Sequence, residues 1–120
     1  MKTVYNEIKT YTTKDGSVIR ELMHPDRDGN KNQSLAEATI PAGEKTALHK
    51  HECSEEIYHI LQGKGVMVLG ENKITVEIGD TICIPPGMRH NILNSGDVDL
   101  KILCACSPPY LHDDTSLYGY

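Results

Sequence analysis

The chain of 120 residues contains no phenylalanine and no tryptophan. Its hydrophobic core must therefore be built from aliphatic side chains, methionines and the six tyrosines. A chain of this length usually forms one domain, and it buries about two-thirds of the surface that its unfolded form exposes. We therefore expect one domain with a single core.

Positive charge is also scarce. Lysine and arginine together number 12, against 17 aspartates and glutamates, and they form no cluster. This balance argues against a nucleic acid or an anionic membrane surface as a partner. The first residues lack the apolar stretch of a signal peptide, and no segment is apolar over the length that spans a bilayer. We expect a cytoplasmic protein whose partner is a small molecule.

The four cysteines show no Cys-x-x-Cys spacing, so they match no common zinc framework. Cys104 and Cys106 lie in an apolar segment, where a free cysteine behaves as a small hydrophobic residue. We expect these two and Cys83 to be buried and reduced. Cys53 lies in the loop between His51 and Glu56. Three roles are open for it: a plain loop residue, a redox-sensitive thiol or a group beside a bound metal. We favour the first.

Short apolar segments alternate with turn signals along most of the chain, and none has convincing helical periodicity. Eight to ten short strands of this kind predict an all-β sandwich or small barrel. Residues 1–33 are expected to be N-terminal strands and a polar loop that pack on a barrel formed by residues 34–106. The tail, 107–120, follows two prolines and is either an ordered loop or a lid over the barrel. His24 and His112 are expected to have no metal role.

Two histidines, His49 and His51, stand two residues apart in a segment expected to be extended. Alternate side chains of a strand leave the same face, so both imidazoles point the same way. The polar residues 52–55 can turn the chain and bring Glu56 beside the two rings. Two imidazoles and a carboxylate form a binding set for a divalent first-row metal.

A second stretch, residues 79–94, completes a larger pattern. Residues 43–63 resemble the first motif of the cupin family, G(x)5HxH(x)4E(x)6G, and residues 79–94 resemble the second, G(x)5PxG(x)2H(x)3N. Every fixed position of both motifs is filled. The residues at these positions are Gly43, His49, His51, Glu56 and Gly63 in the first motif, and Gly79, Pro85, Gly87, His90 and Asn94 in the second.

The resemblance implies a double-stranded β-helix, or jelly roll, with a single cupin domain. It also implies that His49, His51, Glu56 and His90 bind one divalent metal per chain and that the protein is a homodimer. Nitrogen and oxygen donors without thiolate suit Mn, Fe, Co, Ni, Cu or Zn. With four protein ligands an octahedral metal keeps two open positions, which favours a working centre over a structural one.

Strand alternation predicts which side chains surround the metal. The expected pocket residues are Tyr58, Ile60, Ile92, Leu100, Ile102, Cys104 and Cys106. Tyr58 is either a core aromatic residue or a catalytic proton donor. The other walls are apolar, which suits a small, partly hydrophobic ligand that chelates the metal through one or two oxygens.

The resemblance leaves several functions open, because cupins include dioxygenases, isomerases, decarboxylases, lyases, sugar-binding proteins and storage proteins. The complete ligand set favours a metal-dependent enzyme acting on a small oxygenated metabolite. The apolar pocket ranks oxygenase-like or lyase-like chemistry on an organic acid, enol or ketone above sugar-type isomerisation. The alternative is a sensory or binding cupin that holds a sugar or another small molecule without turnover.

Overall fold

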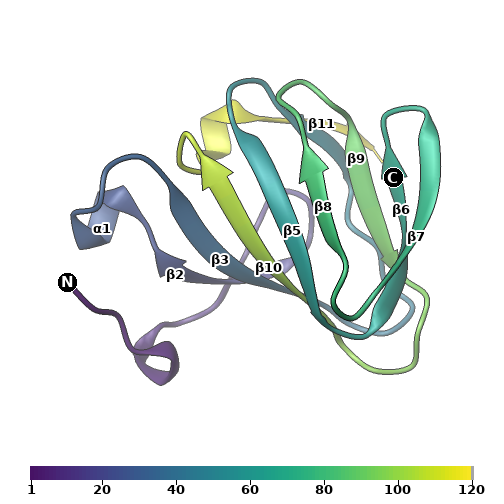
Figure 1. Ribbon diagram of the computed structural model, residues 1–120, viewed down its shortest axis with the longest axis horizontal. Coiled ribbons are helices and arrows are strands. Elements are labelled where there is room, and N and C mark those ends of the chain that lie inside the picture. Colours follow the sequence, from purple (N-terminus) through teal and green to yellow (C-terminus); the bar gives the residue numbers. More distant parts are fainter. Residues whose placement is uncertain (120) are drawn as a thin grey trace.

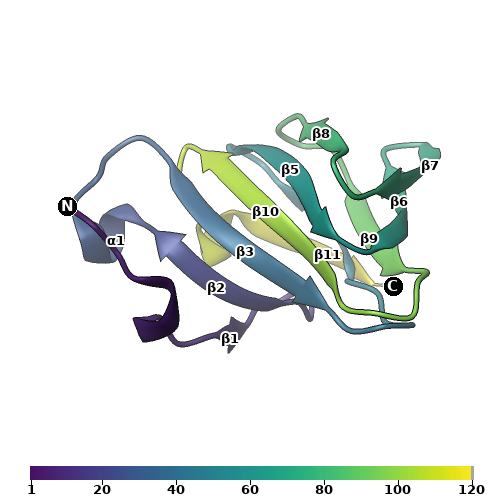
Figure 2. The same cartoon turned by 60° about the horizontal axis from the view of Figure 1, so that its bottom comes forward.

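Two antiparallel sheets face each other in the computed structural model, which describes residues 1–119 (Figure 1). The first sheet has six strands in the order β1-β2-β3-β10-β5-β8, and Figure 2 shows them side by side across the molecule. Their bounds are β1 (Tyr11–Thr12), β2 (Val18–Met23), β3 (Ser34–Ile40), β10 (Leu100–Ser107), β5 (Glu55–Gln62) and β8 (Thr81–Ile84).

The second sheet has five strands in the order β11-β4-β9-β6-β7. Its strands are β11 (Thr115–Gly119), β4 (Leu48–His51), β9 (His90–Asn94), β6 (Lys64–Leu69) and β7 (Asn72–Glu77). Consecutive strands often lie in different sheets, since β4 belongs to the second sheet and β5 to the first. Two such sheets form the jelly roll that the sequence predicts.

Helical structure is limited to single turns among the described residues. The 3-10 turns are η1 (Tyr5–Glu7) and η2 (His112–Asp114), and α1 (Pro25–Asp28) lies within the predicted polar loop. His24 begins α1, because its ring Nδ1 accepts a hydrogen bond from the Asp26 amide at 3.0 Å and proline occupies the first helical position. Among residues 1–119, no helix has the length and apolarity that crossing a membrane requires.

Register in the first sheet separates a filled end of the barrel from a hollow one. On β10 and β5, Ile102 pairs with Ile60, whereas Cys106 pairs with Glu56 at the other end of the same strands. At the filled end the inward side chains of both sheets meet in the core. The fully buried aliphatic side chains and methionine there are Ile60, Met67, Ile92, Leu100 and Ile102, while the fully buried Ile84 pairs with Glu56.

The C-terminal tail belongs to the second sheet. Strand β11 pairs with β4, and Thr115 lies opposite His51 while Leu117 lies opposite His49. Part of the tail is therefore a strand at the edge of the second sheet, beside the strand that carries His49 and His51. The sequence predicts an ordered loop or a lid for this segment. At the N-terminal side, β1 and β2 extend the first sheet beyond β3.

A candidate metal centre beside a cavity

Strand β4 carries the first two histidines of the site. His49 and His51 are buried, and the intervening Lys50 lies on the opposite face, as the two-residue spacing predicts. Strand β9 brings the third ring, because His90 pairs directly with His49 across the sheet and their ring centroids are 4.1 Å apart. Glu56 reaches the same place from β5 in the opposite sheet, and it is also buried.

The turn before β9 explains the glycine of the second motif. Gly87 has a φ of 78°, which side chains with a Cβ rarely adopt, and its amide donates a 2.7 Å hydrogen bond to the carbonyl of His51. The corner that precedes His90 is thereby tied to the strand that carries the other two histidines. Asn94, the last motif residue, has a structural role, since its side-chain amide donates to the carbonyls of Ile40 and Val98 at 2.8 Å each.

The ligand-type atoms of these side chains converge. One ring nitrogen from each of His49, His51 and His90 lies within 4.8 Å of the others. The Oε1 of Glu56 is 3.4 Å from the Nε2 of His51 and 3.4 Å from the Nε2 of His90. Donors that surround a metal at about 2.0–2.2 Å lie at comparable separations from one another.

Hydrogen bonds fix the tautomer of all three rings. The Nδ1 of His49 donates to the Ala47 carbonyl at 2.7 Å, and the Nδ1 of His90 donates to the Met88 carbonyl at 2.9 Å. The Nδ1 of His51 meets the hydroxyl of Thr115 at 3.1 Å. A protonated Nδ1 leaves the Nε2 lone pair of each neutral ring free, which is the arrangement of metal-binding histidines.

Two buried polar atoms at this centre have no hydrogen-bond partner. They are the Oε1 of Glu56 and the Nε2 of His90, two of four such side-chain atoms among the residues that the structure describes. A buried polar atom without a partner costs about 1–3 kcal/mol. A divalent metal among the four side chains would remove this cost at both atoms, so the residues fit the ion.

Burial and neighbouring groups determine the protonation states of the candidate ligands. Burial, and next the neighbouring His90, lower the pKa of His49 to about 4, so the ring is neutral at neutral pH. For Glu56, burial favours the protonated acid, but the rings of His51 and His90 outweigh it and hold the pKa well below its usual range. Neutral imidazoles with an ionised carboxylate are the protonation states that a metal requires.

Three of the four candidate ligands, His49, His51 and Glu56, line a cavity of about 50 Å³, whereas His90 is not part of its wall. A space of this size holds a few water molecules or a small ligand. Among the other lining residues polar types outnumber apolar ones, although the exposed area of the wall is mainly apolar. The polar ones are Tyr11, Thr13, Asp15, Ser17, Glu21, Ser34, Tyr58, Tyr110 and Thr115, and the others are Ile19, Ala36, Ala38, Cys104 and Cys106.

The structure divides the predicted pocket residues into two groups. Tyr58, Cys104 and Cys106 line the cavity. The remaining four point inward as the alternation predicts, but they lie in the core at the filled end and are absent from the cavity wall; they are Ile60, Ile92, Leu100 and Ile102. Alternation gives the face of a strand but not the depth along it. The exposed area of the cavity wall is mainly apolar, as expected, but carboxylates and hydroxyls that the sequence does not predict also line it.

Tyr58 and Cys106 contact the centre from the first sheet. The Tyr58 ring packs edge-on to His90 with centroids 6.1 Å apart, and burial with the charge of Glu56 raises the pKa of its phenol. The Cys106 thiol donates a 3.2 Å hydrogen bond to the Oε2 of Glu56, which leaves Oε1 directed at the histidines. Tyr58 therefore remains a neutral proton donor beside the centre.

The loop between His51 and Glu56 is held by the tail. Asp114 accepts hydrogen bonds from the amide of Cys53 at 3.0 Å and from the amide of Ser54 at 3.2 Å. The Cys53 side chain is exposed, which agrees with a loop residue. Cys83 is also exposed, contrary to the expectation of burial, because it lies on the outer face of the edge strand β8.

Eleven lining residues are missed by reasoning from the sequence, and they include Tyr11, Asp15, Glu21, Tyr110 and Thr115. A signal exists for Glu21, since Ser17, Ile19 and Glu21 alternate on one face of β2 and the residue before it. Asp15 is part of a turn signal in the sequence, which gives no hint of a cavity. Tyr110 and Thr115 have no local signal, because they reach the cavity through long-range pairing of the tail with β4.

Comparison with known proteins agrees with this architecture. An uncharacterised protein of Methanocaldococcus jannaschii is 57% identical over 117 residues, covering 98% of this chain and 94% of its own. An oxalate-binding protein of Thermotoga maritima is 37% identical over 84 residues, covering 70% of this chain and 65% of its own.

Solved structures give the same result for the fold. The crystal structure of a predicted oxalate decarboxylase of Thermotoga maritima superposes with a TM-score of 0.77 at 29% identity, covering 90% of this chain and 99% of its own. The nucleoside dehydratase Pac13 reaches a TM-score of 0.82 at 14% identity, covering 100% of this chain and 92% of its own. The family model for the cupin domain matches residues 36–106, and the chain belongs to the cupin family.

Proposed function

We propose that this cupin binds one divalent first-row metal through His49, His51, His90 and Glu56, and uses it to hold and transform a small oxygen-bearing metabolite. The observation that carries the proposal is the orientation of the donors. Each Nδ1 is engaged, and the Nε2 atoms of His51 and His90 face Glu56 Oε1 beside the cavity. Four protein donors leave positions for a ligand that enters from the cavity mouth.

The metal, when bound, supplies a Lewis acid for a carbonyl or hydroxyl oxygen. The protein supplies the proton chemistry around it. Tyr58 is a neutral phenol beside His90 and is placed to donate a proton to a ligand in the cavity. Cys106 holds Glu56 through its other oxygen.

Polar groups in the cavity wall change which reactions this site favours. A wholly apolar pocket would suit an oxygenase or lyase acting on an organic acid, but this cavity also offers carboxylates and hydroxyls along its wall. Such groups satisfy the hydroxyls of a hydroxylated metabolite, which would otherwise cost about 1–3 kcal/mol each. Isomerase-like or lyase-like proton transfer on a hydroxylated carbonyl compound therefore stands first, with oxygenase chemistry second.

A binding protein without turnover is the second candidate. Its support is the 37% identity to a relative named as an oxalate-binding protein. The two candidates share the metal centre and differ in whether the bound ligand reacts. Exchange of ligand C–H for deuterium in D2O, observed by NMR, separates them, because only an enzyme that moves a proton produces exchange that depends on the metal.

The metal centre itself is tested by elemental analysis of the protein as purified and after reconstitution. His51→Ala should abolish stoichiometric binding. His59→Ala is the matched control, because His59 lies on the opposite face of β5, where its Nδ1 meets the Thr81 hydroxyl at 2.8 Å. A full metal equivalent with unchanged spectra in His51→Ala would overturn the proposal.

A further inference from the structure

A second carboxylate besides Glu56 faces the candidate metal centre, from the turn before β2. Asp15 lies in the turn between β1 and β2, and it is only 9% exposed although it belongs to a turn near the surface. Its Oδ2 is 3.5 Å from the Nε2 of His49. Neither cupin motif contains this residue, which precedes the first motif by more than one strand.

The two oxygens of Asp15 have different surroundings. Oδ1 accepts hydrogen bonds from the hydroxyl of Thr13 at 2.5 Å, the hydroxyl of Ser17 at 2.7 Å and the amide of Ser17 at 3.0 Å. Oδ2 instead faces His49 Nε2, which carries a lone pair in this tautomer and donates no hydrogen bond. Oδ1 thus anchors the carboxylate, while Oδ2 faces the candidate metal centre, where it can accept a hydrogen bond from a ligand.

Negative charge dominates the whole cavity. Its lining contains Asp15, Glu21 and Glu56 but no lysine or arginine among the described residues. The three carboxylates outweigh the two positive charges of a divalent metal, so the loaded cavity repels an anion. The Tyr11 phenol donates to Glu21 at 3.2 Å, and burial with the charge of Glu21 raises the pKa of Tyr11, so the phenol stays neutral and does not cancel the charge of Glu21.

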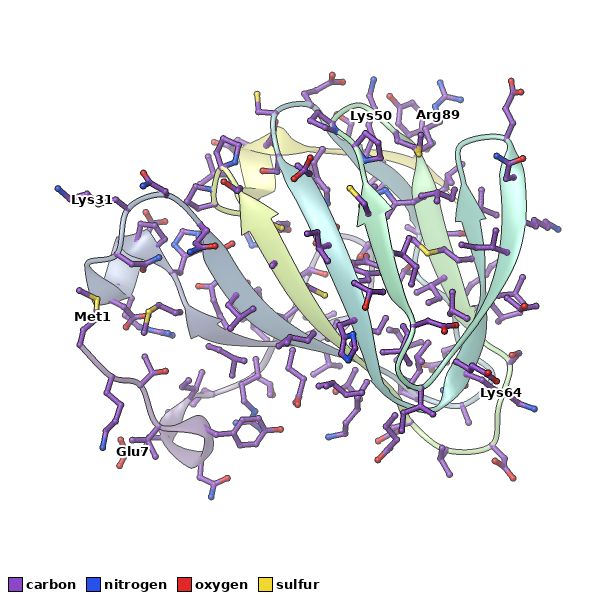
Figure 3. The ribbon with its side chains drawn as sticks, in the orientation of Figure 1. Met1, Glu7, Lys31, Lys50, Lys64 and Arg89 are labelled. Atoms are coloured by element: carbon purple, nitrogen blue, oxygen red, sulfur yellow. The ribbon has the colours of Figure 1, made fainter. Side chains whose placement is uncertain are left out.

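Basic side chains lie outside the cavity. Figure 3 shows Lys31, Lys50, Lys64 and Arg89 at the periphery of the molecule, pointing away from the ribbon. Two further basic residues are engaged: Arg27 pairs with Asp28 at 2.6 Å, and Lys14 donates to the carbonyl of His112 at 2.9 Å. A dicarboxylate or phosphate in the cavity would find no cationic partner besides the metal among the lining residues that the structure describes.

We propose that the cavity selects neutral ligands with a hydroxyl beside the oxygen that meets the metal, and that Asp15 accepts the hydrogen bond of this hydroxyl. The inference rests on the proposed metal centre and narrows its substrate class to hydroxy ketones, polyols and sugar-like compounds. Sites built to bind a substrate hydroxyl discriminate strongly against ligands that lack one. Oxalate is such a ligand, and its two charges add repulsion from Asp15 and Glu21.

The test compares two small ligands of similar size, oxalate and dihydroxyacetone, on the cobalt-loaded protein. Cobalt stoichiometry and the visible spectrum are recorded first, and each ligand is then titrated against that spectrum. The variants are Asp15→Asn, which keeps an oxygen for the Oδ1 hydrogen bonds, and Glu21→Gln. Asp97→Asn removes a charge from an exposed loop and serves as control.

Asp15→Asn should bind oxalate about tenfold more tightly than the unmodified protein and dihydroxyacetone about tenfold more weakly, since hydrogen bonds to charged groups have this magnitude. Glu21→Gln should also bind oxalate more tightly than the unmodified protein. This variant tests the effect of the cavity charge even if Asp15→Asn does not fold. Asp97→Asn should change neither affinity. Failure of the unmodified protein to bind cobalt would overturn the proposed metal centre. Full cobalt binding with an oxalate affinity that neither variant changes would overturn the role of Asp15 and the cavity charge.

Discussion

His51 and Thr115 are hydrogen-bonded across 64 residues of sequence, with 3.1 Å between Nδ1 and Oγ1. The Thr115 hydroxyl donates its own hydrogen to the Leu111 carbonyl at 3.2 Å, so it accepts from the ring and fixes the tautomer of His51. Strand β11 lies outside the barrel predicted for residues 34–106, yet its Thr115 fixes the tautomer of a candidate metal ligand inside that barrel.

Thr115→Val should weaken metal binding by about 10–100-fold, the usual effect of losing a partner that orients a ligand. The substitution keeps the β-branched shape but leaves the Nδ1 of His51 without an acceptor. Thr115→Ser retains the hydroxyl and should bind nearly as tightly as the unmodified protein. Competition with a chromophoric chelator measures both affinities. Equal affinities for the valine and serine variants would contradict the role of this hydrogen bond.

The metal-free protein should lose stability as the pH falls from about 6.5 toward 4. In this range the unfolded chain protonates His49, whereas in the folded protein burial and His90 lower its pKa to about 4. The unfolded state therefore binds more protons, and acidification favours it. Glu56, whose folded pKa is lowered, contributes stability that is lost only below its ordinary value near 4.5.

Urea unfolding of the chelator-treated protein measures this effect. Between about pH 7 and about pH 5 the free energy of unfolding should fall by about 2 kcal/mol through His49. His49→Gln removes the titrating ring and should show a smaller change over the same interval. A stability of the unmodified protein that stays constant or increases on acidification would contradict the lowered pKa.

The candidate metal ligands could be predicted from the sequence, but not from local rules alone. His49 and His51 share a strand face through their two-residue spacing, whereas His90 is predicted by the resemblance to the second cupin motif. Alternation and turn signals indicate an all-β sandwich or small barrel, and the resemblance narrows this to the jelly roll. The local part of the prediction needs no knowledge of how distant segments pair.

The cavity could not be predicted in the same way. Tyr58 and Ile60 lie on one face of β5, yet the first lines the cavity and the second fills the core, because the gap between the sheets closes along the strand. Asp15 and Thr115 reach the cavity through the β1–β2 turn and through β11, from opposite ends of the chain. Only the pairing of distant strands determines that these polar groups surround the centre.

Native alkylation should distinguish the four cysteines. Burial, followed by the charge of Glu56, raises the pKa of Cys104 and Cys106, so neither thiol should react with iodoacetamide at neutral pH. Cys53 is exposed, but hydrogen bonding to Asp114 raises its pKa and should slow it relative to the exposed Cys83. Mass spectrometry of time points gives the order, and Asp114→Asn should accelerate Cys53 alone. Early modification of Cys106 would contradict the geometry of the centre.

The outer face of the six-stranded sheet should bind a second copy of the chain. Ile57 and Leu61 are each 40% exposed on this face of β5. The N-terminal segment covers a different part, since the Tyr5 phenol donates to Glu37 on β3 at 2.6 Å. Exposed apolar side chains that share one face of a sheet are typical of a surface buried on association.

Analytical ultracentrifugation at micromolar concentration should therefore show a homodimer. Ile57→Glu should weaken it by about tenfold or more, because a carboxylate would be buried without a partner. Ile78→Glu is the matched control, since Ile78 is 66% exposed in the turn after β7 and lies outside the sheet face. A monomer for the unmodified protein would refute the dimer, and dimers of equal strength in both variants would place the interface elsewhere. The metal content should be unchanged in Ile57→Glu, because its side chain points away from Glu56 and the three histidines.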